Sequence, residues 1–325
     1  MNISIDIIIP CYNSHDTIDR CLGSILCQRV LPSIKVTLVR DGGKGYKDII
    51  KRYSPVMDIQ QIGYDKNGGP AVARNYGMTH TSGDLIMFMD SDDSLAGPFS
   101  VIDLVNGMYE EPGTVIGVAD FIEEVAPMHF KHHTEDSTFV HGKMYRRDYL
   151  ERNNILFNAN ERTNEDVSFN ILSLILMKPN EKVKYIKKVC HYWLCNPSSI
   201  VRSNKDEFDH SISVRSFIRN IAHIYDELEK RNLQDDRHTL LERVASMSRV
   251  CNMYAEKLRG YEQYQKENFE ELKRFYKKVY QLYEHLVTKE MTDMVFDKYP
   301  FKNVFQLSKE ELANLIKSLG EEDEV

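Results

Sequence analysis

The first ninety residues alternate short apolar segments with segments of helical spacing, and this alternation restricts the chain to few folds. Short apolar strands separated by helices are typical of a mostly parallel sheet that is buried on both faces. The pattern therefore predicts an α/β fold. It places strands over residues 3–10, 34–41, 57–64 and 84–90, and helices over residues 14–28, 46–53 and 69–79, with Ser14 capping the first helix.

The rest of the chain predicts a mixed segment followed by a helical one. In the mixed segment we expect helices that begin at Pro98 and near Thr163 or Asn164, and strands over 114–125 and 182–193. Strand signals then disappear, and residues 272–286 carry an apolar and aromatic stripe at helical spacing. We therefore divide the chain into an α/β domain, residues 1–205, and a helical C-terminal module, residues 206–325.

Composition and charge exclude several classes of protein. The net charge of −7 argues against a surface that coats nucleic acid. No apolar run approaches the roughly 20 residues of a membrane span, and the acidic N-terminal segment does not resemble a secretion signal. The six cysteines form no CxxC pair, which favours reduced thiols. We expect a cytoplasmic protein, either free or peripheral at the inner membrane surface.

A cluster of acids directly follows the fourth apolar segment, in the sequence "LIMFMDSDD". Asp90 and Asp92 are two residues apart, so in an extended chain their side chains point the same way. Neighbouring carboxylates disfavour each other's ionised form, so a positive partner is expected. A divalent cation, or a sugar hydroxyl beside one, would explain this DxD pattern. The alternative is a plain acidic turn after a strand.

Three of the predicted strands end in polar groups or turns. The first ends in "PCYN", the second in "RDGG" and the fourth in "DSDD". In an open parallel sheet, ligands bind beyond the carboxyl ends of the strands. The convergence of three such ends on one edge predicts a ligand site there.

These segments resemble the family 2 glycosyltransferases of the GT-A fold, in both order and spacing. The resemblance covers about residues 3–203 and implies a Rossmann-like mixed sheet that binds a nucleotide-diphosphate sugar. The segments that carry it are "IDIIIPCYNSHDTIDRCLGSILCQ", "VTLVRDGG", "KNGGPAVARNYG", "SGDLIMFMDSDD" and "NEDVSFN". A dehydrogenase of the Rossmann class would need G-x-G-x-x-G after the first strand, where "PCYNSH" stands instead.

The resemblance implies a metal site and a binding site for donor hydroxyls at the acidic cluster. It assigns Asp92 to Mn²⁺ or Mg²⁺ and Asp90 to the ribose or sugar hydroxyls. For Asp93 we favour a cap of the following turn over a contact to the metal through water. His191 is a further candidate ligand, although a histidine in a strand is more often structural.

The resemblance also implies the residues around the nucleobase. Asp41 is expected to accept a hydrogen bond from the base, and Pro10 and Tyr12 to border it. Asn67 and Arg74 belong to the same donor site, where Arg74 contacts the base or organises the acidic loop. Relatives usually carry two acids before the glycine, and here the first is Arg40, which leaves the base undetermined and would either form a salt bridge or point away from the ligand.

The catalytic base and a lid complete the expected site. The resemblance assigns Asp166 as the base, with Glu165 as the fallback. A helix N-terminus would lower the pKa of Asp166 and keep it ionised. Arg202 lies where relatives carry a loop that closes over the diphosphate. We expect a solvated loop, not a zinc site, at the three clustered histidines His129, His132 and His133.

The sequence therefore predicts an inverting, metal-dependent glycosyltransferase of the hexosyltransferase type. We expect a UDP-sugar donor and a bacterial or viral surface glycan as acceptor. A modified DNA base or a protein is the alternative acceptor. A non-catalytic oligomer that binds nucleotide sugars is the alternative function. The helical module would shape the acceptor site, mediate formation of a homo-oligomer, or both.

Overall fold

The computed structural model describes residues 3–29, 33–196 and 207–233 of the 325-residue chain. The chain divides into two units, Met1–Ser203 and Asn204–Val325, which we describe separately. The apolar stripe at residues 272–286 and Arg202 lie outside the described residues. The described part of the second unit, residues 207–233, contains α7, Glu207–Lys230, in which buried apolar residues such as Ile218, Ile221 and Leu228 recur at helical spacing.

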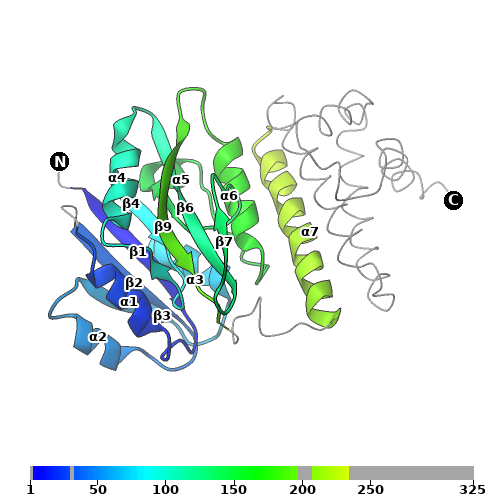
Figure 1. Cartoon of the computed structure of the whole chain (residues 1–325). Coiled ribbons are helices and arrows are strands. Elements are labelled where there is room, and N and C mark those ends of the chain that lie inside the picture. The colour runs from blue at the N-terminus through cyan, green and yellow to red at the C-terminus, as the bar shows by residue number, and fades with distance from the viewer. Residues whose placement is uncertain (1–2, 30–32, 197–206, 234–325) are drawn as a thin grey trace. The chain divides into compact units, whose positions relative to one another are not determined.

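The first unit alternates strands and helices along its N-terminal half, as the sequence predicts (Figure 1). Its strands are β1 Ser4–Cys11, β2 Ser33–Asp41, β3 Ile59–Tyr64, β4 Leu85–Phe88, β5 Ser94–Leu95, β6 Thr114–Ala126, β7 His129–His133, β8 Lys143–Arg146 and β9 Lys182–Trp193. Its helices are α1 Ile18–Leu26, α2 Lys47–Tyr53, α3 Pro70–Thr79, α4 Ser100–Glu110, α5 Arg147–Arg152 and α6 Glu165–Ile175. The sequence did not predict β5, β7, β8 or α5.

The strands form one mixed sheet in the order β3-β2-β1-β4-β8-β6-β9-β5, with β7 paired to β6. The strands β3, β2, β1 and β4 are parallel, whereas β8 runs antiparallel to both β4 and β6. The chain places β2 on one side of β1 and β4 on the other, so the strand order reverses at β1. The carboxyl edge beside such a reversal is where open α/β sheets bind ligands.

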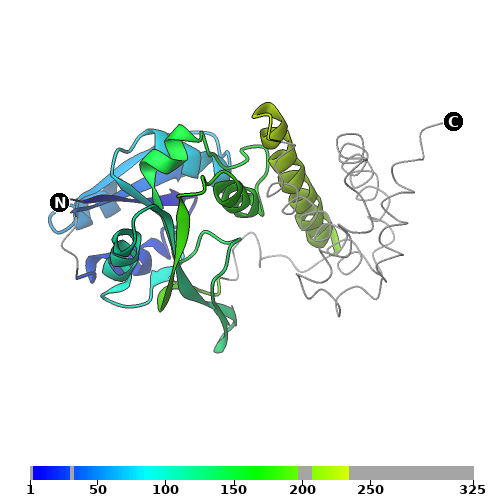
Figure 2. The same ribbon diagram turned by 90° about the horizontal axis from the view of Figure 1, so that it is seen from above.

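Helices cover both faces of the sheet (Figure 2). One core combines the buried faces of α1 and α4 with alternate residues of β1, among them Ile7 and Ile9. Helix α3 packs against β1, β2 and β3. At Gly77 of α3, a Cβ atom would lie 2.4 Å from Cγ2 of Ile8, so only glycine permits this close approach.

Several local predictions are wrong in detail. Helix α1 begins at Ile18 with Thr17 as N-cap, whereas the Ser14 side chain shares a hydrogen bond with the Tyr46 hydroxyl. Helix α4 begins at Ser100, two residues after Pro98. The predicted histidine loop is strand β7, in which His133 Nε2 lies 2.9 Å from Glu123 of β6. Pairing with β6 explains this difference, because local composition does not reveal a partner strand.

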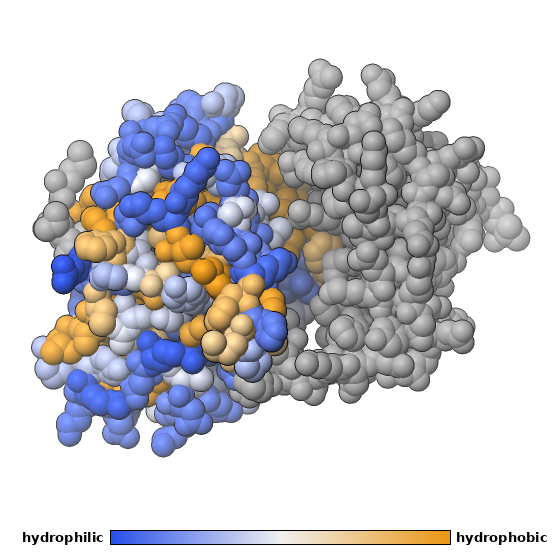
Figure 3. All heavy atoms as spheres, viewed as in Figure 1, coloured by the Kyte–Doolittle hydropathy of each residue, from blue (hydrophilic) through white to orange (hydrophobic). Residues whose placement is uncertain are grey.

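Exposed apolar residues on the first unit are few and scattered. On the face shown in Figure 3 they form small groups separated by hydrophilic residues. Among the most exposed are Met128 and Phe130, at the hairpin of β6 and β7. None of the helices in the described ranges has the length and hydropathy that a membrane span requires.

Arg147 is a buried cross-link between four segments. Its guanidinium donates to Asp6 of β1 at 2.7 Å, to the Met78 carbonyl of α3 at 2.8 Å and to the Gly83 carbonyl before β4 at 2.6 Å. The Arg147 side chain is 9% exposed, and that of Asp6 is 3% exposed. Arg147 therefore fixes α5 and α3 against the central strands.

We expect Arg147→Met to lower the free energy of unfolding by about 3–5 kcal/mol, because the carboxylate of Asp6 would remain buried without its cation. Arg52→Met is the matched control, since Arg52 forms a surface pair with Asp19 and should contribute less than about 1 kcal/mol. Urea denaturation followed by circular dichroism measures both. Equal effects of the two substitutions would contradict the cross-linking role of Arg147.

Candidate active site

A cleft of about 390 Å³ lies at the carboxyl ends of β1, β2 and β4, where the strand order reverses. Residues from separate predicted motifs meet in it, although the roles assigned to them stay predictions. The predicted site residues that line it are Pro10, Tyr12, Asp41, Asn67, Arg74, Asp90, Asp92, Glu165 and Asp166. His191 lies behind this lining, and Arg202 is outside the described residues.

Arg74 of α3 connects two acidic motifs of the cleft. Its Nη2 donates to Asp90 Oδ1 at 2.7 Å, and its Nη1 donates to Glu165 Oε1. The guanidinium carbon also lies 5.3 Å from the ring centroid of Phe157, and the Arg74 side chain is only 4% exposed. These contacts hold the acidic loop and the start of α6 together, and a contact of Arg74 with the base stays a prediction.

The two acids that begin α6 have different environments. Asn164 adopts a left-handed conformation with φ of 57°, and the helix starts directly after it. Glu165 is buried in its ion pair with Arg74. Asp166 lines the cleft, and its Oδ1 accepts a hydrogen bond from the Val167 amide at 3.0 Å. This arrangement favours Asp166 over Glu165 as the group that meets a substrate.

The expectation that the helix N-terminus lowers the pKa of Asp166 is wrong. Burial, followed by the neighbouring charge of Glu165, raises the pKa of Asp166 to about 7, and the charge of Arg74 only partly opposes this. The loss of hydration therefore outweighs the favourable helix dipole. A carboxylate with a pKa near 7 is well matched to general-base chemistry at neutral pH.

Asp41 organises the loop that leads into α3. Its carboxylate accepts the amides of Gly68 and Gly69 at 2.6 and 2.9 Å, and the Asn67 side chain donates to the Asp41 carbonyl at 3.3 Å. Gly69 has a φ of 94°, a conformation that favours glycine. Contact of Asp41 with a nucleobase stays a prediction.

The rim beside Asp41 is formed by Pro10 and Tyr12, at the end of β1. Tyr12 is exposed, which suits a ring that borders a ligand. Arg40 does not line the cleft, because it forms an ion pair with Asp65 at 2.7 Å. The unusual arginine before Asp41 therefore follows the first of the alternatives considered for it, a salt bridge.

Asp92 lies in the cleft and is held by the segment after β9. Its Oδ2 accepts a hydrogen bond from the Asn196 side chain at 2.8 Å, while Arg20 donates to its carbonyl oxygen. Burial raises the pKa of Asp92, and the charge of Asp90 raises it further. Because the ionised form of this acid is penalised, a cation at Asp92 would offset the excess negative charge.

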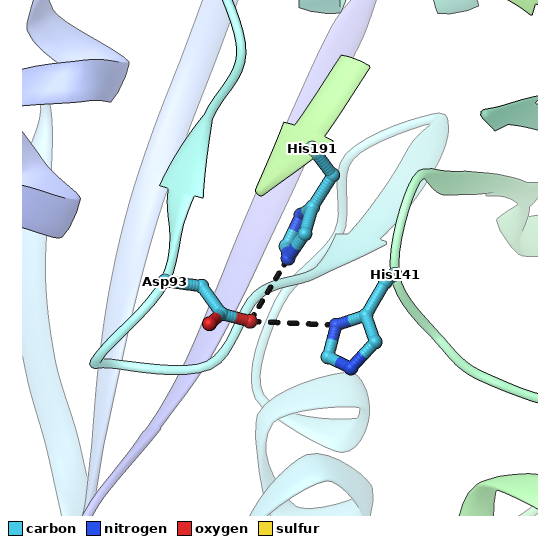
Figure 4. A group of neighbouring side chains, drawn as sticks. All are labelled: Asp93, His141 and His191. Carbon is cyan, nitrogen blue, oxygen red and sulfur yellow. Dashed lines mark hydrogen bonds and ion pairs between the residues drawn. The ribbon is translucent and has the colours of Figure 1, made fainter. Parts of the chain in front are cut away.

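Asp93 does not cap the following turn, so the role favoured for it is wrong. It lies before β5, fully buried, with its Oδ2 2.9 Å from His191 Nε2 and 3.4 Å from His141 Nδ1 (Figure 4). Its Oδ1 accepts the Leu194 amide at 3.0 Å. Sequence reasoning missed His141, because an isolated histidine 48 positions from Asp93 carries no local signal.

Two groups in this region have metal-ligating chemistry. Asp93, His141 and His191 are the one set of three or more His, Cys, Asp or Glu residues in the described part of the chain whose ligand atoms all lie within 4.8 Å of one another. Two imidazoles and one carboxylate suit transition metals better than Mg²⁺. The Asp92 carboxylate, in contrast, offers oxygen atoms, the ligand type that Mg²⁺ and Mn²⁺ prefer. The cleft therefore fits the expected cation at Asp92.

Comparison with known proteins confirms the predicted family. Residues 6–164 match the family model described as "Glycosyl transferase family 2". The chain is 28% identical over 225 residues to the uncharacterized glycosyltransferase EpsJ of Bacillus subtilis, an alignment that covers 60% of the chain. It is 26% identical over 209 residues to the poly(ribitol-phosphate) beta-N-acetylglucosaminyltransferase TarP of Staphylococcus aureus, over 58% of the chain. Each alignment spans 62% of the relative's own length, less than two thirds.

The predicted GT-A fold is also confirmed by a solved structure. Residues 1–349 of TarS from S. aureus, crystallised with UDP-GlcNAc, match with a TM-score of 0.68 at 17% sequence identity. The match covers 98% of this chain and 91% of that one. At this identity the likeness establishes the fold alone.

We expect Asp166→Asn to raise the melting temperature at pH 8. The pKa of Asp166 is raised from 3.8 to about 7 in the folded protein, so the folded state favours the protonated acid. The stability that protonated Asp166 provides is therefore present at low pH and is lost as pH rises through 7. Asparagine resembles the protonated acid and removes this penalty. Each kcal/mol gained corresponds to about 2–4 °C in a calorimetric scan, and the difference should vanish near pH 4.

Asp136→Asn provides a control of opposite sign. Burial alone would raise the pKa of Asp136, but the charge of Lys143 and hydrogen bonds from the Phe139 and Thr138 amides lower it overall. Its ionised form therefore stabilises the fold, and Asp136→Asn should melt at a lower temperature at pH 8. If Asp166→Asn also melted below the wild-type protein at pH 8, the claim that ionised Asp166 destabilises the fold would be disproved.

Proposed function

We propose that this protein transfers a sugar, with inversion, from a UDP-sugar to a hydroxyl group of a surface glycan. The observation that carries the proposal is the meeting of Asp41, Asp92 and Asp166 in one cleft, from three motifs far apart in the sequence. Nucleotide, diphosphate and acceptor would each be met by a different one of these three carboxylates, which line one continuous space. The match of residues 6–164 to glycosyl transferase family 2 supports this assignment.

Donor binding would use the end of β2 and the acidic loop. Asp41, Pro10 and Tyr12 would hold the nucleobase, while Asp90 would accept hydroxyls of the ribose or sugar. Asp92 would hold Mn²⁺ or Mg²⁺, which acts as a Lewis acid on the departing diphosphate when bound. UDP-GlcNAc is the first donor to test, because TarS was crystallised with it and TarP is named for the same sugar.

Asp166 would act as the general base. Its carboxylate takes the proton of the acceptor hydroxyl while the hydroxyl oxygen forms a bond to the anomeric carbon of the donor. The bond from that carbon to the diphosphate oxygen breaks on the opposite face, so the configuration inverts. Arg74 would act through its neighbours, since its ion pairs with Asp90 and Glu165 fix the loop and the helix that carry the reacting groups.

The acceptor class rests on relatives and not on geometry. The name of TarP specifies a poly(ribitol-phosphate) acceptor, which supports a surface polymer over a DNA base or a protein. A role of residues 206–325 in acceptor binding or self-association stays a prediction, because most of them lie outside the described residues. Closure by Arg202 stays a prediction for the same reason. The cytoplasmic location also stays a prediction.

We expect UDP-GlcNAc with Mn²⁺ to stabilise the protein against thermal unfolding, by about 2.7 kcal/mol at a hundredfold excess over Kd. The Asp92→Asn variant should lose the part of this thermal stabilisation that depends on Mn²⁺. Asp65→Asn is the matched control, since this acid is exposed and pairs with Arg40 outside the cleft. Stabilisation by GDP-mannose but by no UDP-sugar would refute the assignment of a UDP-sugar as donor. An effect of Mn²⁺ that is preserved in Asp92→Asn would refute the assignment of Asp92 as a metal ligand.

We expect Asp166→Asn to lower turnover by about 10²- to 10⁴-fold, the typical contribution of a positioned base. In the wild-type enzyme, kcat/KM should rise with pH through the pKa of Asp166, because the base acts in its ionised form. Initial-rate measurements with a transferred radiolabelled sugar provide both results. Near-normal transfer by Asp166→Asn together with failure of Glu165→Gln would move the base to Glu165.

A further inference from the structure

Two aromatic side chains line the cleft that the proposed reaction does not use. Phe139 precedes β8 and Trp193 ends β9, and their ring centroids lie 5.3 Å apart with planes inclined by 47°. Both residues are partly exposed. Buried His141 lies against Trp193, at 5.0 Å between ring centroids and 26° between planes. The pair is therefore a supported aromatic surface that faces the cleft.

Hydrogen bonds connect this surface to the acidic loop on one side. The Leu194 amide, directly after Trp193, donates to Asp93 at 3.0 Å. Three residues after Trp193, the Asn196 side chain donates to Asp92 at 2.8 Å. The ring of Trp193 is thus positioned from the same loop that carries the predicted metal ligand.

On the other side, the surface is connected to the helix of the base. The Asn170 side chain donates to the Thr138 carbonyl, directly before Phe139, at 2.8 Å, and to the Asp166 carbonyl at 2.9 Å. The Phe139 carbonyl accepts a hydrogen bond from Lys143. Phe139 and Trp193 are therefore fixed between the diphosphate end of the cleft and the base, where transfer would occur.

This surface has the chemistry that recognises a sugar ring. One face of a pyranose presents C–H groups, and the face of an aromatic ring carries the negative part of its quadrupole. Asn196 and Asp166 provide polar groups at the edge of the surface for the outward hydroxyls. An open-chain polyol has no such flat C–H face and would gain little from stacking.

We propose that Phe139 and Trp193 form a stacking platform for the pyranose ring of the acceptor, which presents one hydroxyl to Asp166. The proposal rests on the proposed glycosyl transfer and narrows its acceptor to surface glycans that end in a sugar ring, in contrast to the open-chain ribitol acceptor in the name of TarP. The donor sugar is also a pyranose, but Asp90 and the cation at Asp92 would hold it at the acidic loop, whereas the segment of Phe139 is connected through Asn170 to the helix of the predicted base. The platform therefore belongs to the acceptor.

Trp193 is the only tryptophan among the 325 residues, so fluorescence excited at 295 nm reports on this ring alone. The probes are the methyl β-glycosides of glucose, galactose and N-acetylglucosamine, with ribitol as the open-chain comparison, each added to protein with UDP and Mn²⁺. We expect a saturable change in emission with at least one glycoside and none with ribitol. No change with any glycoside, or an equal change with ribitol, would overturn the proposal.

A second fluorescence titration tests whether the sugar ring that stacks on the platform belongs to the donor or to the acceptor. UDP-glucose and UDP-GlcNAc are compared with UDP, each with Mn²⁺ and without acceptor. We expect the same Trp193 emission for all three, because the donor sugar does not touch the platform. A saturable change with a UDP-sugar that UDP does not produce would assign the platform to the donor and overturn the acceptor role.

Substitutions test the platform in the transfer reaction. We expect Trp193→Leu and Phe139→Leu to raise KM for the glycoside acceptor by about tenfold or more, with a smaller change in kcat. Trp193→Phe keeps an aromatic face and should recover most of the loss. Phe130→Leu, at an exposed aromatic residue of β7 outside the cleft, is the matched control and should leave KM unchanged.

The substitution results distinguish failure of the platform from failure of the proposed function. If the wild-type protein transfers no sugar from any UDP-sugar, the proposed function fails, while the fluorescence titration still reads the platform. If transfer occurs and Trp193→Leu and Trp193→Phe raise KM equally, aromatic stacking is refuted. Thermal melts of each variant identify any loss of fold.

Discussion

The site depends on one buried cation, Arg74. It pairs with Asp90, 16 positions later, and with Glu165, 91 positions later, so a single guanidinium positions both the acidic loop and the start of α6. A planar fork of donors can satisfy two carboxylates at once, which an ammonium group does less well. Without the Arg74 guanidinium, Asp90 and Glu165 would repel each other in a poorly hydrated space. Asp92 and Asp166, which follow these two acids in the chain, would then lose their fixed separation.

The same region contains more negative charge than Arg74 can balance. Burial raises the pKa of Asp92, Asp93 and Asp166 together, and neighbouring acids add to each shift. A fold selected for stability alone would not gather these groups. The excess is consistent with a site that is completed by a cation and with a base that accepts a proton near neutral pH. Stability is thus reduced at the residues to which we assign the chemistry.

Local patterns predicted the first four strands and the motifs that line the cleft, because strand ends and turns leave a strong signature in sequence. They could not predict which side chains pair across long separations. The bond between Asp93 and His191 spans 98 positions, and β7 became a strand only through β6. The predicted direction of the pKa shift of Asp166 was wrong for the same reason, since burial and the charge of Glu165 depend on packing that no local pattern encodes.

The position of Mn²⁺ tests the central claim most directly. Crystals grown with Mn²⁺ and UDP would be measured at a wavelength where manganese scatters anomalously. This account predicts a strong anomalous peak in the cleft within about 2.5 Å of an Asp92 carboxylate oxygen. A peak only between Asp93, His141 and His191, with none at Asp92, would contradict it.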